Sequence, residues 1–192
     1  MRQKVRPADI IRKYYSDSPL AWQLLLEHSR RVCRRALKIA RGLNRSEPVD
    51  CQFVAEATML HDIGMILTDT PALGCFGNGS YLTHGVRGRE LLEKEGLPRH
   101  ALVCERHIGI GLTAAEILEQ KLDLPARDML PETLEEQIIC YADLYFSKNP
   151  KNRGKEKSPD DVRRALEKFG REKVLVFDRW LQCFEPELSC HG

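Results

Sequence analysis

Apolar residues recur at helical spacing along most of the chain, and this pattern predicts an all-α protein. From Leu20 to about Leu43 they return every three or four positions, while arginines and lysines fill most of the other face. Ser18 and Pro19 stand directly before this segment, where a capping residue and a first-turn proline favour the start of a helix. A long amphipathic helix is therefore expected over 20–43.

The following segment, 51–60, is apolar on nearly every side, which is typical of a buried central helix. Asp50 is its expected N-cap. The segment ends at His61 and Asp62, so these two polar residues are expected to leave the helix from within the core. Gly64 is then expected to allow the chain to turn.

The remaining pattern also favours helices joined by loops. A long glycine-rich loop is expected at 68–82, a basic loop at 149–158, and no strand is identified, with 174–177 left ambiguous. Thr83 is the expected cap of the next helix, and Thr133 with Glu136 has the spacing of a capping box. Further helices are expected at 84–95, 99–108, 113–121 and 133–148, and from Ser158 onward with an interruption at Gly170.

Composition places the chain among ordinary globular domains. Its 192 residues are 42% hydrophobic and 30% charged. This size predicts one domain over 1–192, a helical bundle with its core at about 20–148 and a C-terminal helical extension at about 158–185. No apolar run approaches the roughly 20 residues that cross a bilayer, and no signal-peptide segment develops, so no membrane partner is expected.

Cysteine usage predicts a reducing compartment. The number of cysteines, seven, is odd, and none forms a Cys-x-x-Cys pair, so they are interpreted as reduced thiols of a cytoplasmic protein. The net charge of +2 decides nothing about partners. Two basic segments, 30–45 and 148–173, could attract nucleic acid, but without interleaved aromatic residues they are interpreted as solvent-facing helix surfaces.

Imidazole and carboxylate groups occur on the predicted helices or at their ends, and they are numerous enough to hold two divalent metal ions. His28 and Asp143 occupy apolar-face positions, where a buried carboxylate requires a cation. Such a mixed donor set suits Fe, Mn, Zn, Co or Ni. His100 and His191 are interpreted as ordinary structural histidines. The candidate ligands are His28, His61, Asp62, His84, His107 and Asp143.

The order of these residues resembles that of the HD-domain metal-dependent phosphohydrolases. The matching motifs are Glu27-His28-Ser29-Arg30-Arg31-Val32, His61-Asp62-Ile63-Gly64 and Tyr141-Ala142-Asp143. His84 and His107 match the two-metal version of the family. The stretches Glu105-Arg106-His107-Ile108-Gly109 and Pro131-Glu132-Thr133-Leu134-Glu135-Glu136-Gln137 further resemble a small subgroup of stand-alone HDIG proteins.

The resemblance implies an all-α bundle of the HD-domain type and hydrolysis of a phosphoester, in a nucleotide or a phosphodiester, by metal-activated water. One ion would be held by His28, His61, Asp62 and Asp143, and a second by Asp62, His84 and His107. His61 and Asp62 would be the catalytic pair. Fe or Mn is the preferred metal, with Co, Ni, Zn or Mg as alternatives.

Three basic residues are expected to contact the phosphate. Arg87 lies one helical turn after His84, Arg106 adjoins His107, and Lys148 follows the helix that carries Asp143. In the glycine-rich loop, Asn78 or Tyr81 could also reach the substrate. Many relatives have a lysine or arginine after His-Asp-Ile-Gly, where this chain has Met65.

The sequence leaves several alternatives open. The same ligand set could hold a di-iron centre that acts as an oxygenase, or the domain could be a non-catalytic nucleotide-binding module. The expected partner is a small phosphorylated substrate, in the first place a nucleotide; nucleic acid is less favoured, and a homodimer stays open.

Overall fold

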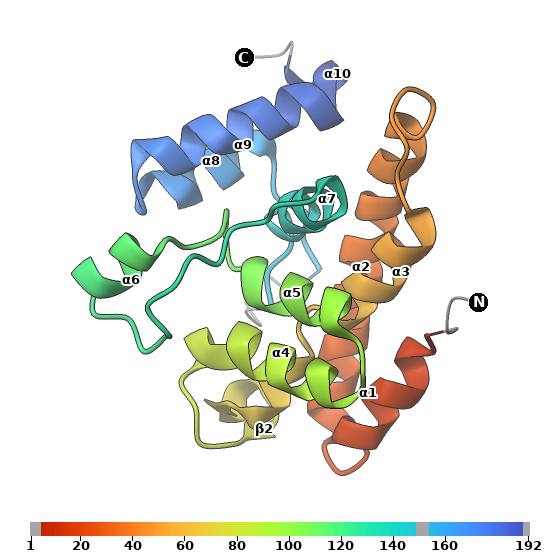
Figure 1. Ribbon diagram of the computed structural model, residues 1–192, viewed down its shortest axis with the longest axis vertical. Helices are drawn as coiled ribbons and strands as arrows, with labels where there is room; N and C mark the ends of the chain where they lie inside the picture. The colour runs from red at the N-terminus through yellow and green to blue at the C-terminus, as the bar shows by residue number, and fades with distance from the viewer. Residues whose placement is uncertain (1–4, 149–153, 190–192) are drawn as a thin grey trace.

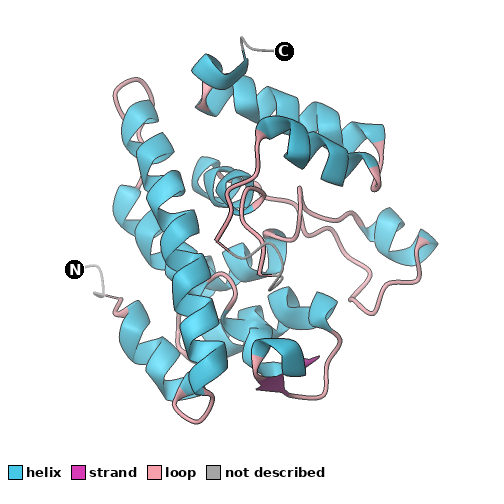
Figure 2. Ribbon diagram, turned by 180° about the vertical axis from the view of Figure 1, so that it is seen from behind, coloured by secondary structure: helices cyan, strands magenta, loops and turns pink. Residues whose placement is uncertain are grey.

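The computed structural model describes residues 5–148 and 154–189, and the regular secondary structure of this part of the chain is almost entirely helical (Figure 1, Figure 2). The predicted all-α class is confirmed, because the one sheet among the described residues pairs β1 (Asp69–Thr70) with β2 (Cys75–Phe76). The helices, including the short 3₁₀ turns labelled η, are α1 (Pro7–Tyr15), α2 (Pro19–Leu43), α3 (Cys51–Leu60), η1 (Ile63–Leu67), η2 (Pro71–Leu73), η3 (Tyr81–Thr83), α4 (His84–Lys94), α5 (Pro98–Arg106), α6 (Ala114–Glu119), α7 (Leu134–Asp143), α8 (Pro159–Glu167), α9 (Arg171–Phe184) and α10 (Pro186–Ser189).

The long helix α2 is the element around which the others pack. It runs beside α3 and also contacts α7 (Figure 1). Its start after Ser18 and its end at Leu43 agree with the sequence pattern, and its apolar stripe is buried as expected.

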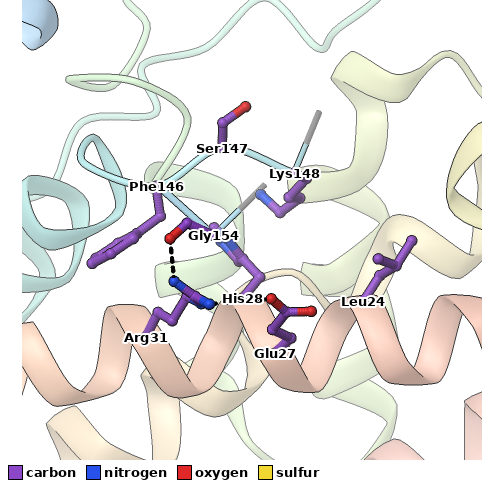
Figure 3. A pocket seen from close by; sticks show the side chains of 8 residues that line it. All are labelled: Leu24, Glu27, His28, Arg31, Phe146, Ser147, Lys148 and Gly154. Carbon is purple, nitrogen blue, oxygen red and sulfur yellow. Dashed lines mark hydrogen bonds and ion pairs between the residues drawn. The ribbon is translucent and has the colours of Figure 1, made fainter. Parts of the chain in front are cut away.

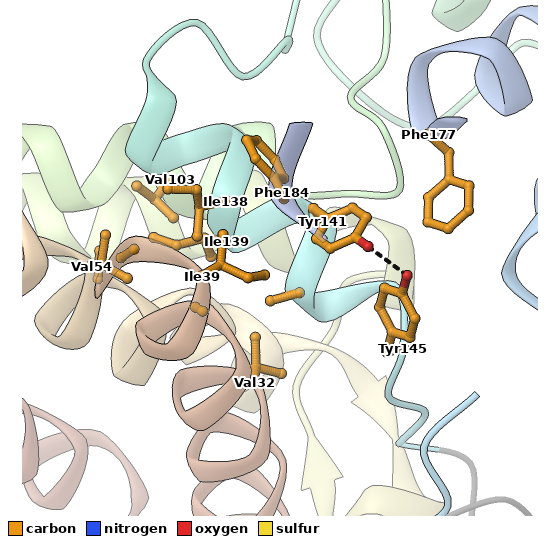
Figure 4. Packing of buried hydrophobic residues seen from close by; sticks show 14 of the residues in the cluster. Val32, Ile39, Val54, Val103, Ile138, Ile139, Tyr141, Tyr145, Phe177 and Phe184 are labelled. Carbon is orange, nitrogen blue, oxygen red and sulfur yellow. Dashed lines mark hydrogen bonds between the residues drawn. The ribbon is translucent and has the colours of Figure 1, made fainter. Parts of the chain in front are cut away.

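One hydrophobic core fills the space between the C-terminal half of α2 and helices α3, α7 and α9. Figure 4 shows its side chains interdigitating, with the Tyr141 and Tyr145 hydroxyls hydrogen-bonded to each other at 2.7 Å. Each fully buried aliphatic or aromatic side chain stabilises such a core by roughly 1.5–3 kcal/mol. The fully buried members of α2, α3, α7 and α9 include Val32, Val54, Ile138, Ile139, Tyr141 and Phe177.

A second core lies between α1, the N-terminal half of α2, η1, α4 and α5. It includes Leu25 of α2, one turn before His28, whereas Val32 of the same helix lies in the first core, one turn after His28. His28 therefore lies on the stretch of α2 where one core gives way to the other.

Helix α1 has no counterpart among the predicted helices. Its sequence is rich in charged residues, but Ile11 and Tyr15 are fully buried against the second core. These two residues lie four positions apart and so share one face of the helix. The burial that stabilises this short helix depends on residues far away in the sequence.

The predicted end of the helix over 133–148 was wrong, because α7 ends at Asp143. The carbonyls of Leu144 and Tyr145 accept hydrogen bonds from the side chain and the backbone N–H of Lys157, both at 2.9 Å. Phe146 then forms a β-bridge with Glu156. These long-range bonds turn the chain back, so that Lys148 does not continue the helix direction.

Smaller differences concern caps and loops. The Thr133 hydroxyl accepts a hydrogen bond from the Glu136 N–H, but the Glu136 carboxylate accepts from Glu132 instead of completing a capping box. Thr83 is the N-cap residue of α4, as expected, but its hydroxyl accepts no hydrogen bond from the first turn of the helix. The loop at 68–82 contains the short β-pair, and the ambiguous segment 174–177 is helical within α9.

The C-terminal helices α8 and α9 contribute side chains to the first core, and α10 packs against α9 (Figure 1). Glu185, which follows α9, is buried and accepts hydrogen bonds from Tyr141 at 2.9 Å and from Arg35 of α2. The extension is thereby tied to α2 by a buried ion pair and to α7 by a hydrogen bond.

The described cysteines agree with the expected free thiols, since Cys33, Cys51, Cys75, Cys104, Cys140 and Cys183 are all unpaired. Cys190 and His191 lie outside the described residues. Across 5–148 and 154–189, no helix combines the length and the apolar character that a membrane crossing requires.

Candidate metal centre

Three helix segments bring four of the predicted ligands together. His28 comes from the middle of α2, His61 and Asp62 follow the end of α3, and Asp143 is the last residue of α7. His28 Nε2 lies 2.8 Å from Asp143 Oδ1 and 3.2 Å from Asp62 Oδ2, while His61 Nε2 lies 3.0 Å from Asp62 Oδ2. These donor atoms converge on one point.

The other two predicted ligands face the opposite oxygen of the same aspartate. The Nε2 atoms of His84, at the start of α4, and of His107, after α5, each lie 3.3 Å from Asp62 Oδ1. They are 3.1 Å from each other. Asp62 thus divides the cluster, with His28 and His61 on its Oδ2 side and His84 and His107 on its Oδ1 side.

The ring orientations of three histidines are set by the same local device. In each, Nδ1 lies 2.6–2.7 Å from the carbonyl oxygen of the residue three positions earlier. A protonated Nδ1 that donates to a carbonyl leaves the Nε2 lone pair available to a metal ion, as in many metal sites. The pairs are His61 with Thr58, His84 with Tyr81, and His107 with Cys104.

The cluster is buried and its electrostatics are strongly coupled. His61 and Asp62 are 0% exposed, and Asp143 is 17% exposed. Burial opposes ionisation of Asp62, but the charges of His61 and Lys148 outweigh it and hold its pKa well below its usual range. Burial likewise favours neutral His61, but Asp62 and Asp143 raise its pKa to about 10. Burial lowers the pKa of His107 to about 4, so this imidazole is neutral.

The donor set fits a divalent cation. Both oxygens of Asp62 and Oδ1 of Asp143 are buried without a well-formed hydrogen bond from the described residues, although nitrogens surround them. A buried carboxylate in this state requires a nearby positive charge. Either of two triads, which share His61, could hold an ion, since the donor atoms of each lie within 4.8 Å of one another: His28, His61 and Asp143, or His61, Asp62 and His107.

Lys148 brings a positive charge to the Asp62 carboxylate. Its Nζ lies 2.7 Å from Asp62 Oδ2. Burial disfavours the ammonium form, but Asp62, Tyr81 and Asp143 outweigh it and raise the pKa of Lys148, so the side chain stays charged. Of the three basic residues predicted to contact substrate, Lys148 is the one that the structure places directly on the cluster.

The other two predicted phosphate contacts have different partners. Arg87 donates from Nε to Thr83 Oγ1 at 3.0 Å and from Nη1 to Asn78 Oδ1 at 3.1 Å, on the wall of the loop that precedes α4. Arg106 forms ion pairs of 3.0–3.1 Å with Glu132 and Glu136. A phosphate-binding role for Arg87 or Arg106 remains a prediction.

Gly64 is required by a close approach of two backbones. A Cβ at this position would lie 2.1 Å from the His84 carbonyl oxygen and 2.3 Å from the Gly88 nitrogen. The predicted turn after the His-Asp pair exists, but the glycine is needed for this contact between η1 and α4 and not for a positive φ. The contact brings His84 against Asp62.

Tyr15 supports the same turn and was not identified from the sequence. Its hydroxyl accepts a hydrogen bond from the Ile66 N–H at 3.1 Å and donates to the Ile63 carbonyl at 3.0 Å. The sequence feature that could have identified it is the four-residue spacing of Ile11 and Tyr15, which places both on one apolar helix face. His100, in contrast, agrees with its structural interpretation, since it is buried between Phe53 and Glu56.

A narrow mouth leads to the cluster beside His28 and Lys148 (Figure 3). Its volume is about 10 Å³, which is about the room of one water molecule. Arg31 reaches across it and donates to the Gly154 carbonyl at 2.6 Å. The lining residues are Leu24, Glu27, His28, Arg31, Phe146, Ser147, Lys148 and Gly154.

Comparison with known proteins agrees with this geometry. A family model described as HD domain matches residues 25–146. An uncharacterized protein of Methanocaldococcus jannaschii is 37% identical over 147 residues, which cover 75% of this chain and 76% of that protein. No solved structure matches the chain significantly.

Two further relatives are much longer proteins. The tRNA (cytidine(56)-2'-O)-methyltransferase of Picrophilus torridus is 35% identical over 125 residues, covering 65% of this chain and 32% of that enzyme. Its namesake in Thermoplasma volcanium is 33% identical over 140 residues, covering 72% of this chain and 35% of that enzyme. The chain therefore spans about a third of these two relatives.

Proposed function

Because this chain belongs to the HD domain family of metal-dependent phosphohydrolases, we propose that it hydrolyses a phosphoester with water activated at a binuclear metal centre. The observation that supports two ions is the position of Asp62, whose two carboxylate oxygens face separate pairs of histidines. A carboxylate with histidine nitrogens around each of its oxygens is a natural bridge between two cations.

In this proposal His28, His61, Asp62 and Asp143 would hold one ion, and Asp62, His84 and His107 would hold the other. A divalent ion lowers the pKa of water and offsets the negative charge of a phosphate. The donor set favours Fe or Mn, with Co, Ni, Zn or Mg as alternatives.

The chain itself contributes orientation and charge. The carbonyls that accept from His61, His84 and His107 hold each ring with Nε2 directed at Asp62. The Lys148 ammonium, which lies next to Asp62 and lines the mouth, would donate hydrogen bonds to a phosphate oxygen there. Burial of His61 and Asp62 keeps bulk water away from the reacting group.

A water nucleophile is favoured over a protein nucleophile. Cys104 and Cys140 each precede a candidate ligand, His107 and Asp143, by three residues, but burial raises the pKa of each thiol well above its usual range. Both thiols also donate to backbone carbonyls, of Leu60 and Arg106. A thiol in this state is a poor nucleophile.

The substrate we propose contains a nucleotide. Two relatives are named as tRNA methyltransferases, and in both the similarity covers most of this chain. These names favour a phosphoester in RNA, or in a nucleotide derived from it, over other phosphoesters.

We also propose a cytoplasmic location, which the free thiols of the described cysteines favour.

The test is hydrolysis of a chromogenic phosphodiester and of a nucleotide panel with added Mn, Fe, Co or Ni, together with metal analysis. We expect close to two ions per chain and turnover that His61→Ala abolishes while the helical circular dichroism stays unchanged. Oxygen consumption with iron charge-transfer absorption would show an oxygenase instead. Tight nucleotide binding without turnover under any metal would show a binding module.

A further inference from the structure

A row of basic side chains runs along the solvent-facing side of α2. Arg30, Arg34, Lys38 and Arg41 follow one another at intervals of three or four residues, and all four are exposed. Residues at this spacing lie on one face of a helix, about one per turn. The row therefore forms a continuous positive stripe along the helix.

Most of this charge is not neutralised by neighbouring acids. Within the described residues, Arg30, Arg34 and Arg41 have no carboxylate within ion-pair distance, and Lys38 lies 3.9–4.0 Å from Glu185 and Glu187. In contrast, Arg31 pairs with Glu27 at 3.3 Å. Exposed cations without acidic partners attract an anion with little desolvation cost.

A groove joins this stripe to the metal centre. Its volume is about 380 Å³, and it shares two wall residues, Arg31 and Phe146, with the narrow mouth in Figure 3. Glu156 and Glu185 also line it, but Arg35 pairs with both of them. The lining of the groove is Arg31, Arg34, Arg35, Lys38, Phe146, Glu156 and Glu185.

We propose that this groove binds a single-stranded polynucleotide, whose phosphates lie along Arg34, Lys38 and the neighbouring arginines of α2 while the reacting phosphate reaches the mouth. The inference rests on the proposed phosphohydrolase function and names its substrate class. A groove with repeated cations and an aromatic side chain is the arrangement that binds single strands, through phosphate contacts and base stacking. Phe146, at the junction of groove and mouth, supplies the aromatic ring.

The depth of the centre explains why an unpaired strand fits better than a duplex. Asp62 and His61 are completely buried, and the mouth beside His28 has room for about one water molecule. A phosphate held between two paired strands could not approach these residues. A strand end or a flexible unpaired segment could bring a phosphate to the rim of the mouth, beside His28 and Lys148, while its other phosphates stay in the groove.

The experiment measures binding of a labelled single-stranded oligonucleotide to the full chain, with a chelator present to prevent turnover, over a range of salt concentrations. The groove variant is Arg34→Gln with Lys38→Gln. The control variant, Lys94→Gln with Lys168→Gln, removes two exposed charges from α4 and from the residue after α8. Binding is compared for RNA and DNA of one sequence and for their duplexes, and poly-glutamate is used as a competitor.

We expect the groove variant to bind the single strand roughly ten- to thirtyfold more weakly at 0.1 M salt, with the slope of log K against log salt reduced by about 1.4 for two lost contacts. Phe146→Leu should weaken binding about tenfold or more through lost stacking, without changing that slope. The control variant should match the unaltered chain.

Equal losses in the groove and control variants would overturn the proposal. So would equal binding of the duplex, or competition by poly-glutamate as strong as that by an unlabelled oligonucleotide. Binding that depends on the groove, without hydrolysis of any phosphoester, would support the groove and refute the phosphohydrolase. Hydrolysis of a small phosphodiester without groove-dependent oligonucleotide binding would support the phosphohydrolase and refute the groove.

Discussion

His28 Nε2 lies 2.8 Å from Oδ1 of Asp143, although the two residues belong to helices α2 and α7, which are far apart in the sequence. This contact aligns the middle of one helix with the last residue of the other. Because α3 delivers His61 and Asp62 to the same place, three helices are fixed relative to one another by their polar residues as well as by the first core.

The first prediction concerns the central carboxylate. Asp62→Asn keeps the shape of the side chain but removes the charge that faces all four histidines. We expect metal content to fall to at most one ion per chain and hydrolysis to fall by about 100-fold or more. Metal analysis and initial rates measure both effects. The control is His100→Gln, because His100 is a buried histidine that contacts Glu56 outside the cluster, and it should leave the metal content unchanged. Unchanged metal content in Asp62→Asn would contradict the proposed bridging role of Asp62.

The second prediction compares two glycines. Gly64→Ala would place a methyl group 2.1 Å from the His84 carbonyl oxygen, so η1 and α4 must separate. We expect a loss of about 2–3 kcal/mol in the free energy of unfolding, from urea denaturation. Gly42→Ala, in open space near the end of α2, should instead gain about 0.5–1 kcal/mol. Similar effects of the two substitutions would show that the close approach is not needed.

The third prediction concerns Lys148. Its ammonium lies 2.7 Å from Asp62 Oδ2 and compensates buried negative charge when no other cation is bound. We therefore expect Lys148→Met to destabilise the chelator-treated protein by about 3 kcal/mol and the protein with added Mn by much less. Thermal melts in both conditions measure the difference. Lys155→Met, at an exposed lysine of the same loop, should change neither melt. Equal destabilisation in both conditions would refute the compensating role.

The fourth prediction tests how the C-terminal extension is attached. Glu185 is buried and binds Arg35 and Tyr141, so Glu185→Gln would leave the Arg35 guanidinium poorly compensated. We expect a loss of about 3 kcal/mol in a single cooperative unfolding transition. Glu187→Gln, at an exposed glutamate two residues later, should have little effect. A separate early transition for α9 would show that the extension unfolds on its own.

The fifth prediction concerns acid. The hydroxyl and N–H of Ser158, together with Arg164, lower the pKa of Asp161 to about 2. Its unfolded value is about 3.9, so the capping box contributes stability above that pH and loses it as the pH falls toward 2. The protection factors of the amides at the start of α8, which correct for the intrinsic pH dependence of exchange, should therefore fall between about pH 4 and 2. Asp161→Asn should remove this dependence, and a carboxyl that titrates near 4 in the carbon-detected NMR spectrum would contradict it.

Much of the fold follows from local patterns. The apolar spacing of α2, the all-round apolar character of α3 and the cap at Asp50, which accepts from the Phe53 N–H, were all predicted correctly. Such features depend on residues within a few turns of each other, where spacing and capping preferences act directly. The order of the six candidate ligands, which identified the family, is also a property of the sequence alone.

Only the tertiary structure decided how these parts meet. Lys157, by binding the carbonyls of Leu144 and Tyr145, ends α7 and returns Lys148 to the carboxylates. The same turn places Phe146 in the wall of the groove that the α2 arginines line, although the basic segment 30–45 itself contains no aromatic residue. The sequence determined which side chains could bind a metal ion, because that is a matter of chemical type and local spacing. Their convergence required contacts between helices distant in sequence, whose free energies no local pattern encodes.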